Sequence, residues 1–336
     1  MVRLEFVDYA KGLAILLVVI GHLLQYNLVG TSAKELFDII YSFHMPLFMF
    51  LSGYVASLSI GKYLSRKVEY IQKKVYSLVV PFVFMGGLNM LLYKHYSMEY
   101  ILNLFRNPDN GLWFLIVLFC IQLWYLALEY VCSKLKCNKR YLIEGFVGVV
   151  FIAMIIVLNK INHEFSGLYT SPIFYVMFFA GSYAAKFLEP FVKSDIVLLL
   201  SMIGFIVLVP KFHMWQCNSS LLSLSISLFA SIIILRIAMA LEKGDVKSDK
   251  LLLFGKSSLV IYIFHFYLIK ILIDIKIDTS DVSVLPLFVA LGVIAFFVSD
   301  ICVRISNVIS QNRLFNFLVL GRKINHESIR FSRWLR

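Results

Sequence analysis

The chain has 336 residues, of which 60% are hydrophobic and only 15% are charged, and its mean hydropathy is +0.83. One soluble core of this length needs far less apolar surface, so the composition excludes a soluble globular protein and indicates an integral membrane protein. The formal net charge of +12 requires no nucleic-acid partner, because membrane topology and anionic lipid headgroups account for most of it.

Ten apolar stretches predict ten membrane-spanning helices, since a helix that crosses the hydrocarbon core takes roughly 20 residues. They occupy nearly the whole chain, at approximately 7–26, 38–59, 76–93, 111–131, 142–159, 172–187, 196–210, 221–241, 256–274 and 284–303. We therefore expect an all-α fold of about ten transmembrane helices in one domain, 1–310, followed by a basic cytoplasmic tail, 311–336. The first run is too long for a cleavable signal and lacks a small-residue cleavage site, so we expect it in the mature protein.

The distribution of Lys and Arg predicts the orientation, because cytoplasmic loops and helix ends carry the excess of these residues. Most of the 32 Lys and Arg residues lie on the side of the membrane that both termini share. Both termini are therefore expected to be cytoplasmic, in a multi-pass integral protein of the cytoplasmic membrane.

The first span carries three titratable side chains on one face. At about 100° per residue, Lys11 and His22 lie within about 20° of each other and roughly 16 Å apart along the axis. Asp8 precedes Lys11 by three residues, on nearly the same stripe. Ionisable groups inside a span are costly unless they face protein or a wet cavity, so all three are candidate catalytic residues. Structural explanations are the alternative. Asp8 and Lys11 extend their charged groups to the membrane interface or pair with each other, and His22 makes a packing or hydrogen-bonding contact.

The second span brings another imidazole to a similar depth. His44 lies in its outer half, near the predicted level of His22 on the neighbouring antiparallel helix, so the two imidazoles can meet. Ser52 and Tyr54 follow on either side of Gly53, a residue that permits close helix approach. A kink and a packing contact are the alternative explanation for this part of the span.

Later spans add weaker candidates. Trp113 lies near the outer interface, where an aromatic belt is the ordinary explanation. In the ninth span, Ser258, Tyr262 and His265 fall at spacings of four and three residues, hence on one face, and His265 either makes a structural hydrogen bond or lines a cavity. The five cysteines form no CxxC pair, and the chain has no Gly-rich phosphate loop and no HExxH motif, so we expect neither a disulfide framework nor a metal site.

Four stretches resemble the membrane acyltransferase-3 family, especially its branch of fucose O-acetylase-like and polysaccharide-modifying acyltransferases. The two that together are specific read DYAKGLAILLVVIGH (8–22) and FHMPLFMFLSGY (43–54). Two weaker ones read GLWFLIVLFCIQ (111–122) and FGKSSLVIYIFHFYLI (254–269). The resemblance covers essentially the whole chain, including ten spans with both ends inside.

The resemblance implies an enzyme that takes an acyl group, usually acetyl from acetyl-CoA at the cytoplasmic face, and delivers it to a carbohydrate hydroxyl group. It carries an essential histidine over to His22, as a base or as the acyl acceptor. The basic residue eleven positions earlier is commonly Arg in the family and is Lys11 here, which replaces a bidentate contact with a point charge. The family's Arg-x-x-Arg element before the third span is altered as well, with Lys74 at its first position and Ser77 at its second.

Donor binding follows from the same resemblance. CoA is polyanionic, and basic residues that precede the third span on the predicted cytoplasmic side offer charge-assisted hydrogen bonds to its phosphates. The positive-inside bias explains the charges of this loop equally well. The pantetheine arm can then run up the polar face past Lys11 and present its thioester near His22. The candidate donor-binding residues are Lys11, Arg66, Lys67, Lys73 and Lys74.

The predicted function is O-acetylation of a bacterial cell-envelope or capsular glycan, or of its lipid-linked precursor, with no metal. Alternatives are a transporter of a glycan or its lipid-linked unit along the same polar face, and a small-ligand recognition module. Binding and consumption of an acyl-CoA distinguish the enzyme from the transporter. The candidate acceptor-binding residues are His44, Ser52, Tyr54, Trp113, Tyr262 and His265.

Overall fold

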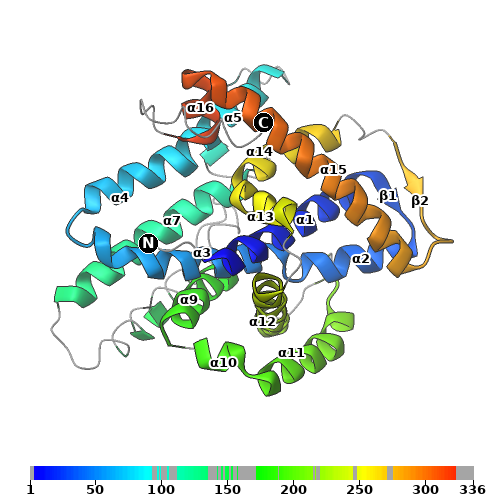
Figure 1. Cartoon of the computed structure of the whole chain (residues 1–336), viewed down its shortest axis with the longest axis horizontal. Coiled ribbons are helices and arrows are strands. Elements are labelled where there is room, and N and C mark those ends of the chain that lie inside the picture. Colours follow the sequence, from blue (N-terminus) through cyan, green and yellow to red (C-terminus); the bar gives the residue numbers. More distant parts are fainter. Residues whose placement is uncertain are drawn as a thin grey trace.

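The computed structural model describes residues 4–92, 112–134, 172–187, 189–214, 220–244, 248–270 and 275–322, together with isolated positions between these ranges. Helices make up nearly all of this part of the chain (Figure 1). In chain order they are α1 (Glu5–Asn27), α2 (Thr31–Tyr41), α3 (His44–Ile60), the 3-10 turn η1 (Gly61–Tyr63), α4 (Lys67–Lys74), the π-helical turn η2 (Val75–Val79), α5 (Val80–Leu92), α7 (Trp113–Lys134), α9 (Pro172–Phe187), α10 (Glu189–Lys193), α11 (Asp195–Leu208), the 3-10 turn η3 (Val209–Lys211), α12 (Ser220–Lys243), α13 (Asp249–Lys256), α14 (Ser258–Lys270), α15 (Val284–Gln311) and α16 (Arg313–Leu320).

Two short strands are a small departure from the all-α prediction. β1 (Leu28–Val29) and β2 (Ile277–Asp278) pair in parallel. Beside them, the backbone N–H and the hydroxyl of Thr279 both donate to the Val29 carbonyl, each at 2.9 Å. This clamp joins the loop after α1 to the loop before α15, which the positive-inside pattern places on the same outer side.

The helices form a multi-pass membrane architecture. Among the described residues, six helices are long and apolar enough to cross a membrane, or seven if α13 and α14 count as one bent span. The count is therefore smaller than the predicted ten. With 16 and 14 residues, α9 and α11 fall short of the roughly 20 that a span takes. The predicted span 142–159 lies outside the described residues, apart from isolated positions.

The first helix lies at the centre of the bundle. α1 packs against α2, α3, α12, α13, α14 and α15 (Figure 1). In an apolar stretch of 18 consecutive residues of α1, 72% of the residues are buried. The corresponding fraction for an equally long stretch of α15 is 22%. α1 is thus surrounded by protein while α15 faces outward, which explains how a membrane helix accommodates Asp8, Lys11 and His22.

Two of the predicted spans are interrupted. The span predicted at 38–59 begins earlier, at Thr31, and breaks at Ser42 and Phe43, so that α3 starts at His44. The span predicted at 256–274 corresponds to α14, and the chain bends by 88° at its start, where α13 precedes it. Such breaks leave helix ends inside a membrane protein, where they are tolerated if they line a cavity or contact protein.

The backbones of α3 and α9 touch where they cross. A Cβ atom on Gly53 would collide with the carbonyl oxygen of Phe178, and one on Gly181 would collide with the carbonyl oxygen of Phe50. Only glycine at both positions allows this separation, in agreement with the close approach predicted at Gly53.

α13 packs against α1 through a second glycine pair. A Cβ atom on Gly12 would collide with the backbone of Leu251, and one on Gly255 would collide with the backbone of Asp8. The bent pair α13 and α14 is therefore held directly against the helix that carries the polar face.

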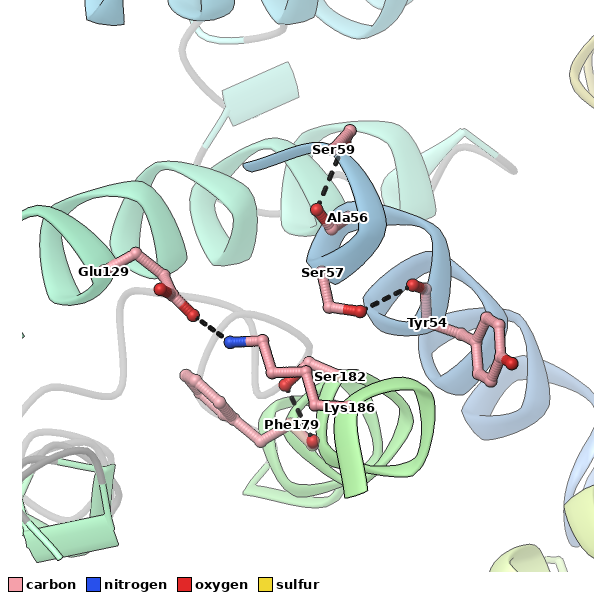
Figure 2. A network of polar contacts seen from close by, with 8 residues as sticks. All are labelled: Tyr54, Ala56, Ser57, Ser59, Glu129, Phe179, Ser182 and Lys186. Carbon is pink, nitrogen blue, oxygen red and sulfur yellow. Dashed lines mark hydrogen bonds and ion pairs between the residues drawn. The ribbon is translucent and has the colours of Figure 1, made fainter. Parts of the chain in front are cut away.

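An ion pair between Lys186 and the buried Glu129 joins α9 to α7. Figure 2 shows the Lys186 ammonium group directed at the carboxylate of Glu129, beside the α3 segment that contains Tyr54 and Ser57. Glu129 is 2% exposed, and the Lys186 ammonium group also lies 5.7 Å from the centroid of the Tyr125 ring. Since a buried carboxylate is costly without a partner, this pair fixes α9 to α7 behind α3.

The predicted tail begins with a packed helix. α16 contacts α5 and α15, and its residues Val319 and Leu320 are each 4% exposed. Residues 323–336 lie outside the described part of the chain, and the assignment of 1–310 and 311–336 as domain and tail stays a prediction.

Candidate active site

A cavity of about 220 Å³ lies between α1, α3, η2 with the end of α4, α7 and α14. Along α3 its lining runs from Met45 to Ser59, about 21 Å at 1.5 Å per residue. Most lining side chains are apolar. The polar ones are Lys11, Ser52, Ser59, Lys74, Ser77, Gln122, Ser258 and Tyr262. The cavity is therefore elongated along the axis of α3, and polar groups alternate along it with a slight majority of apolar side chains.

Two lysines face this cavity. Lys11 from α1 and Lys74 from the end of α4 both line it, are half-buried, and lie within electrostatic range of each other. The Lys74 ammonium group is 5.2 Å from the centroid of the Tyr70 ring. Two like charges beside one partly desolvated cavity repel each other, so an anionic group between them would be stabilised by both.

The first turn of α14 meets the same cavity. Ser258, Leu259 and Tyr262 contribute to the lining. The first N–H groups of a helix have no intrahelical partner, and its N-terminus carries a positive partial charge. The lysines and this helix end therefore favour a negatively charged group in the cavity.

A histidine pair lies farther along α1 and α14. The rings of His22 and His265 are in contact, with centroids 5.1 Å apart and an angle of 42° between their planes. Tyr26 and Phe266 flank His22, each with its ring centroid 5.9 Å from the imidazole centroid. His265 is fully buried, whereas His22 is half-buried.

Each of these two rings has a buried nitrogen without a partner in the described part of the chain. These atoms are Nδ1 of His22 and Nε2 of His265. Nδ1 of His265 lies 2.8 Å from the carbonyl oxygen of Ile261, to which it donates. Buried polar atoms almost always have partners, so two such atoms on touching rings mark a place for a polar group.

His44 has a different setting from the one expected. Its Nδ1 donates to the Ile40 carbonyl at 2.9 Å, and its ring centroid is 4.6 Å from that of Tyr41. His44 is within electrostatic range of His22, as the helix levels predict. The imidazole that contacts the His22 ring, however, is that of His265 on α14, a helix far away in the sequence.

Three other predicted donor-binding residues are not among the cavity-lining residues. Arg66 pairs with Glu69 at 3.8 Å on an exposed surface. The Lys67 ammonium group lies 3.4 Å from the centroid of the Tyr130 ring. Lys73 donates to the hydroxyl oxygen of Tyr63 at 3.3 Å.

Asp8, Tyr54 and Trp113 also lie outside the cavity lining. Asp8 is 4% exposed and lies one helical turn before Lys11. The Tyr54 ring packs edge to face on the Phe6 ring. The centroids of the Trp113 and Phe174 rings are 5.1 Å apart. Of the predicted acceptor-binding residues, Ser52 and Tyr262 line the cavity and His265 contacts His22.

Sequence reasoning missed Gln122 and Phe114. Gln122 lines the cavity and accepts a hydrogen bond from the Tyr70 hydroxyl at 3.4 Å. The Phe114 backbone N–H donates to the hydroxyl oxygen of Tyr262 at 3.4 Å. A polar Gln within an apolar span is a signal that could have revealed the first; the backbone donor of Phe114 leaves no such signal.

The described cysteines Cys120, Cys132 and Cys302 are free thiols. Over the ranges that the structure describes, no group of three or more His, Cys, Asp or Glu residues is placed to hold a metal ion. Cys137 and Cys217 lie outside those ranges.

The sequence of this chain is similar to those of known proteins. Residues 4–304 match a family described as an acyltransferase domain. The nodulation protein NolL of Mesorhizobium japonicum is 45% identical over 82 residues, which cover 23% of this chain and 21% of the relative. The nodulation protein NolL of Sinorhizobium fredii is 30% identical over 138 residues, which cover 38% of this chain and 35% of the relative. The chain thus spans well under two thirds of either relative, and no solved structure matches it at a significant level.

Proposed function

The chain belongs to the acyltransferase-3 family, and from this premise we propose that it is a membrane O-acetyltransferase. Its donor is acetyl-CoA, and its acceptor is a hydroxyl group of a cell-envelope or capsular glycan or of its lipid-linked precursor. The observation that carries the proposal is the cavity that begins at Lys11 and Lys74 and follows α3 toward the level of the two histidines.

The lysine end of the cavity suits the anionic part of the donor. Lys11, Lys74 and the first turn of α14 supply positive charge and N–H donors around one space. A phosphate group of CoA takes charge-assisted hydrogen bonds from such donors, and it relieves the repulsion between the two ammonium groups. With both termini in the cytoplasm, as the Lys and Arg distribution predicts, this end opens toward the compartment that contains CoA.

The part of the cavity that runs along α3 suits the pantetheine arm of acetyl-CoA, which ends in the thioester. Along α3, about 21 Å of lining separates Ser59 from Met45, the residue after His44. An arm lying along this lining brings the acyl group toward His22, which serves as the base or as the acyl acceptor. The apolar walls exclude water, and this protects the thioester from hydrolysis.

The acceptor side is proposed to lie around the histidines. Ser52 and Tyr262 line the cavity, whereas His22, His44 and His265 are not among its lining residues. The ring centroid of His265 lies 6.0 Å from that of Tyr262, which connects the histidine pair to the cavity wall. A hydroxyl group that enters here meets the acyl group without passing the lysines. Donor and acceptor thus approach one reaction centre from opposite ends.

Donor use is the direct test of the function. The full chain is purified, placed in liposomes and given radiolabelled acetyl-CoA, with envelope polysaccharides and lipid-linked oligosaccharides as acceptors. We expect saturable donor binding by calorimetry and transfer of label to hydroxyl groups as alkali-labile esters. Absence of acetyl-CoA binding by folded protein would contradict the proposal and favour a glycan transporter that uses the same polar path.

A double variant tests the lysine end. Replacing Lys11 and Lys74 together by glutamine should raise the Kd for acetyl-CoA by roughly 10- to 100-fold, because a hydrogen bond to a charged group contributes about 1.5–3 kcal/mol. Calorimetry with acetyl-CoA and with dephospho-CoA measures the change. The matched control replaces Lys211 and Lys243 by glutamine. It also removes two charges, both from exposed positions outside the cavity lining, and should leave the Kd unaltered. Equal affinities of the double variant and the control would place the donor elsewhere.

A further inference from the structure

We propose that His265 is a second catalytic residue: it takes the proton of the acceptor hydroxyl group, while His22 carries the acyl group. This inference rests on the proposed function and deepens it, because it divides the reaction between two histidines from α1 and α14. It is carried by the two partnerless nitrogens on touching rings.

The backbone fixes the tautomer of His265. Its Nδ1 donates to the Ile261 carbonyl, one helical turn earlier, at 2.8 Å. A neutral imidazole has one N–H, so Nε2 of His265 carries a lone pair and acts as an acceptor. The ring is fully buried and cannot turn away to find another partner. This side chain is therefore prepared to receive a proton at Nε2.

A hydroxyl group can satisfy both ring nitrogens. It donates one hydrogen bond and accepts others, so its O–H can point at Nε2 of His265 while its oxygen faces His22. An apolar group would leave both nitrogens without partners, which costs about 1–3 kcal/mol for each buried group. The pair of rings therefore selects an alcohol rather than an apolar group.

The two histidines differ in solvent exposure, and this difference assigns their roles. His265 is fully enclosed and held by the backbone, so it is poorly placed to carry an acyl group. His22 is half-buried and shares one face of α1 with Lys11, which lines the cavity. The donor thioester can therefore approach His22 along that face, while His265 acts on the acceptor.

The proposed reaction has two steps. A ring nitrogen of His22 attacks the thioester carbonyl carbon, the C–N bond forms, the C–S bond breaks, and the electron pair leaves with the CoA thiolate. The acceptor oxygen then attacks the acyl carbon, its O–H proton passes to Nε2 of His265, the C–O bond forms, and the C–N bond breaks with its electrons returning to His22. His265 finally releases the proton, which neutralises the thiolate through solvent. The sum is an ester and free CoA from an alcohol and acetyl-CoA.

Isotope exchange separates the two steps. The full chain in liposomes is given acetyl-CoA and labelled CoA without an acceptor, and label entering acetyl-CoA reports the first step alone. Transfer of acetyl to methyl glycosides reports both steps. We expect wild-type exchange, retained exchange in His265→Asn with transfer lowered about 10²- to 10⁴-fold, and loss of both in His22→Asn. The His265→Asn protein should also accumulate acyl label that neutral hydroxylamine releases, as expected for an acyl-imidazole.

A neighbouring residue supplies the matched control. Tyr267→Phe removes a hydrogen bond of 2.8 Å from α14 to Asn89, and both activities should persist. The inference is overturned if wild-type protein transfers acetyl without CoA exchange, if His265→Asn loses exchange and transfer equally, or if its transfer matches that of Tyr267→Phe. The wild-type exchange assay tests only the step on His22, so if His265→Asn does not fold, His265→Gln replaces it in both assays. Lack of acetyl-CoA binding by the wild type would instead refute the proposed function.

Discussion

Replacing His22 by asparagine is expected to lower acetyl transfer by more than about 10³-fold, the largest loss of activity we predict for a single substitution. Asparagine fills much of the same volume and keeps a polar group beside His265 and Tyr26. It cannot serve as a base, and it does not form a labile acyl adduct as imidazole does. Transfer of label from radiolabelled acetyl-CoA to glycan acceptors in liposomes measures the change.

The expected result includes an effect on kcat with donor binding unchanged. His22 lies roughly 16 Å along α1 from Lys11, so the anionic part of acetyl-CoA does not contact it and its Kd should stay constant. Retained binding also reports that the variant is folded. The matched control is His213→Asn, which removes a histidine that pairs with Asp38 at 3.2 Å in the segment after η3, and it should keep near-normal transfer. Similar activities of the two variants would remove His22 from the reaction centre.

Sequence reasoning succeeded where the relevant information is local. The common face of Lys11 and His22 depends only on helical periodicity within one segment, and the polar face could therefore be predicted. The central position of α1 follows from the same face, because charged groups in a span must contact protein or a cavity. Gly53 likewise indicated a close crossing, although the sequence did not identify α9 as the partner.

The contacts between distant segments could not be predicted. His22 and His265 are separated by most of the chain, and their contact depends on how α14 bends away from α13 and packs on α1. The basic loop shows the same limit, because Lys74 lines the cavity while Lys73, its neighbour in the chain, bonds to Tyr63. Adjacent residues on a helix point about 100° apart, so a cluster of charges does not show which one faces a site.

Over the described residues the structure has fewer full-length spans than the sequence predicts, for a related reason. Runs of apolar residues locate buried or lipid-facing segments, but they do not show where a helix breaks or whether it is long enough to cross. α9 and α11 are apolar, yet they have 16 and 14 residues. α9 is held by its crossing with α3 and by the Glu129–Lys186 pair, both of which are tertiary contacts.

Replacing Gly53 by alanine is expected to destabilise the protein by about 1–3 kcal/mol or more, the largest effect on folding we predict. The added methyl group would collide with the carbonyl oxygen of Phe178, which belongs to the backbone and cannot move aside alone. α3 and α9 must therefore separate. Because Ser52 and Ala56 of α3 line the cavity, the separation should also weaken acetyl-CoA binding. Thermal unfolding of the detergent-solubilised protein and calorimetry measure the two effects.

A double-variant cycle shows whether the crossing itself is responsible. Gly181→Ala inserts a methyl group against the carbonyl oxygen of Phe50 at the same crossing, so it should cost a similar amount alone. Once one substitution has separated the helices, the second meets less resistance, and the double variant should lose less stability than the sum of the two. Gly87→Ala on α5 is the control, because its methyl group would meet nothing within 4 Å, and it should be neutral or slightly stabilising. Strict additivity, or a loss in Gly87→Ala as large as in Gly53→Ala, would mean that the close contact of α3 and α9 does not determine the stability of this fold.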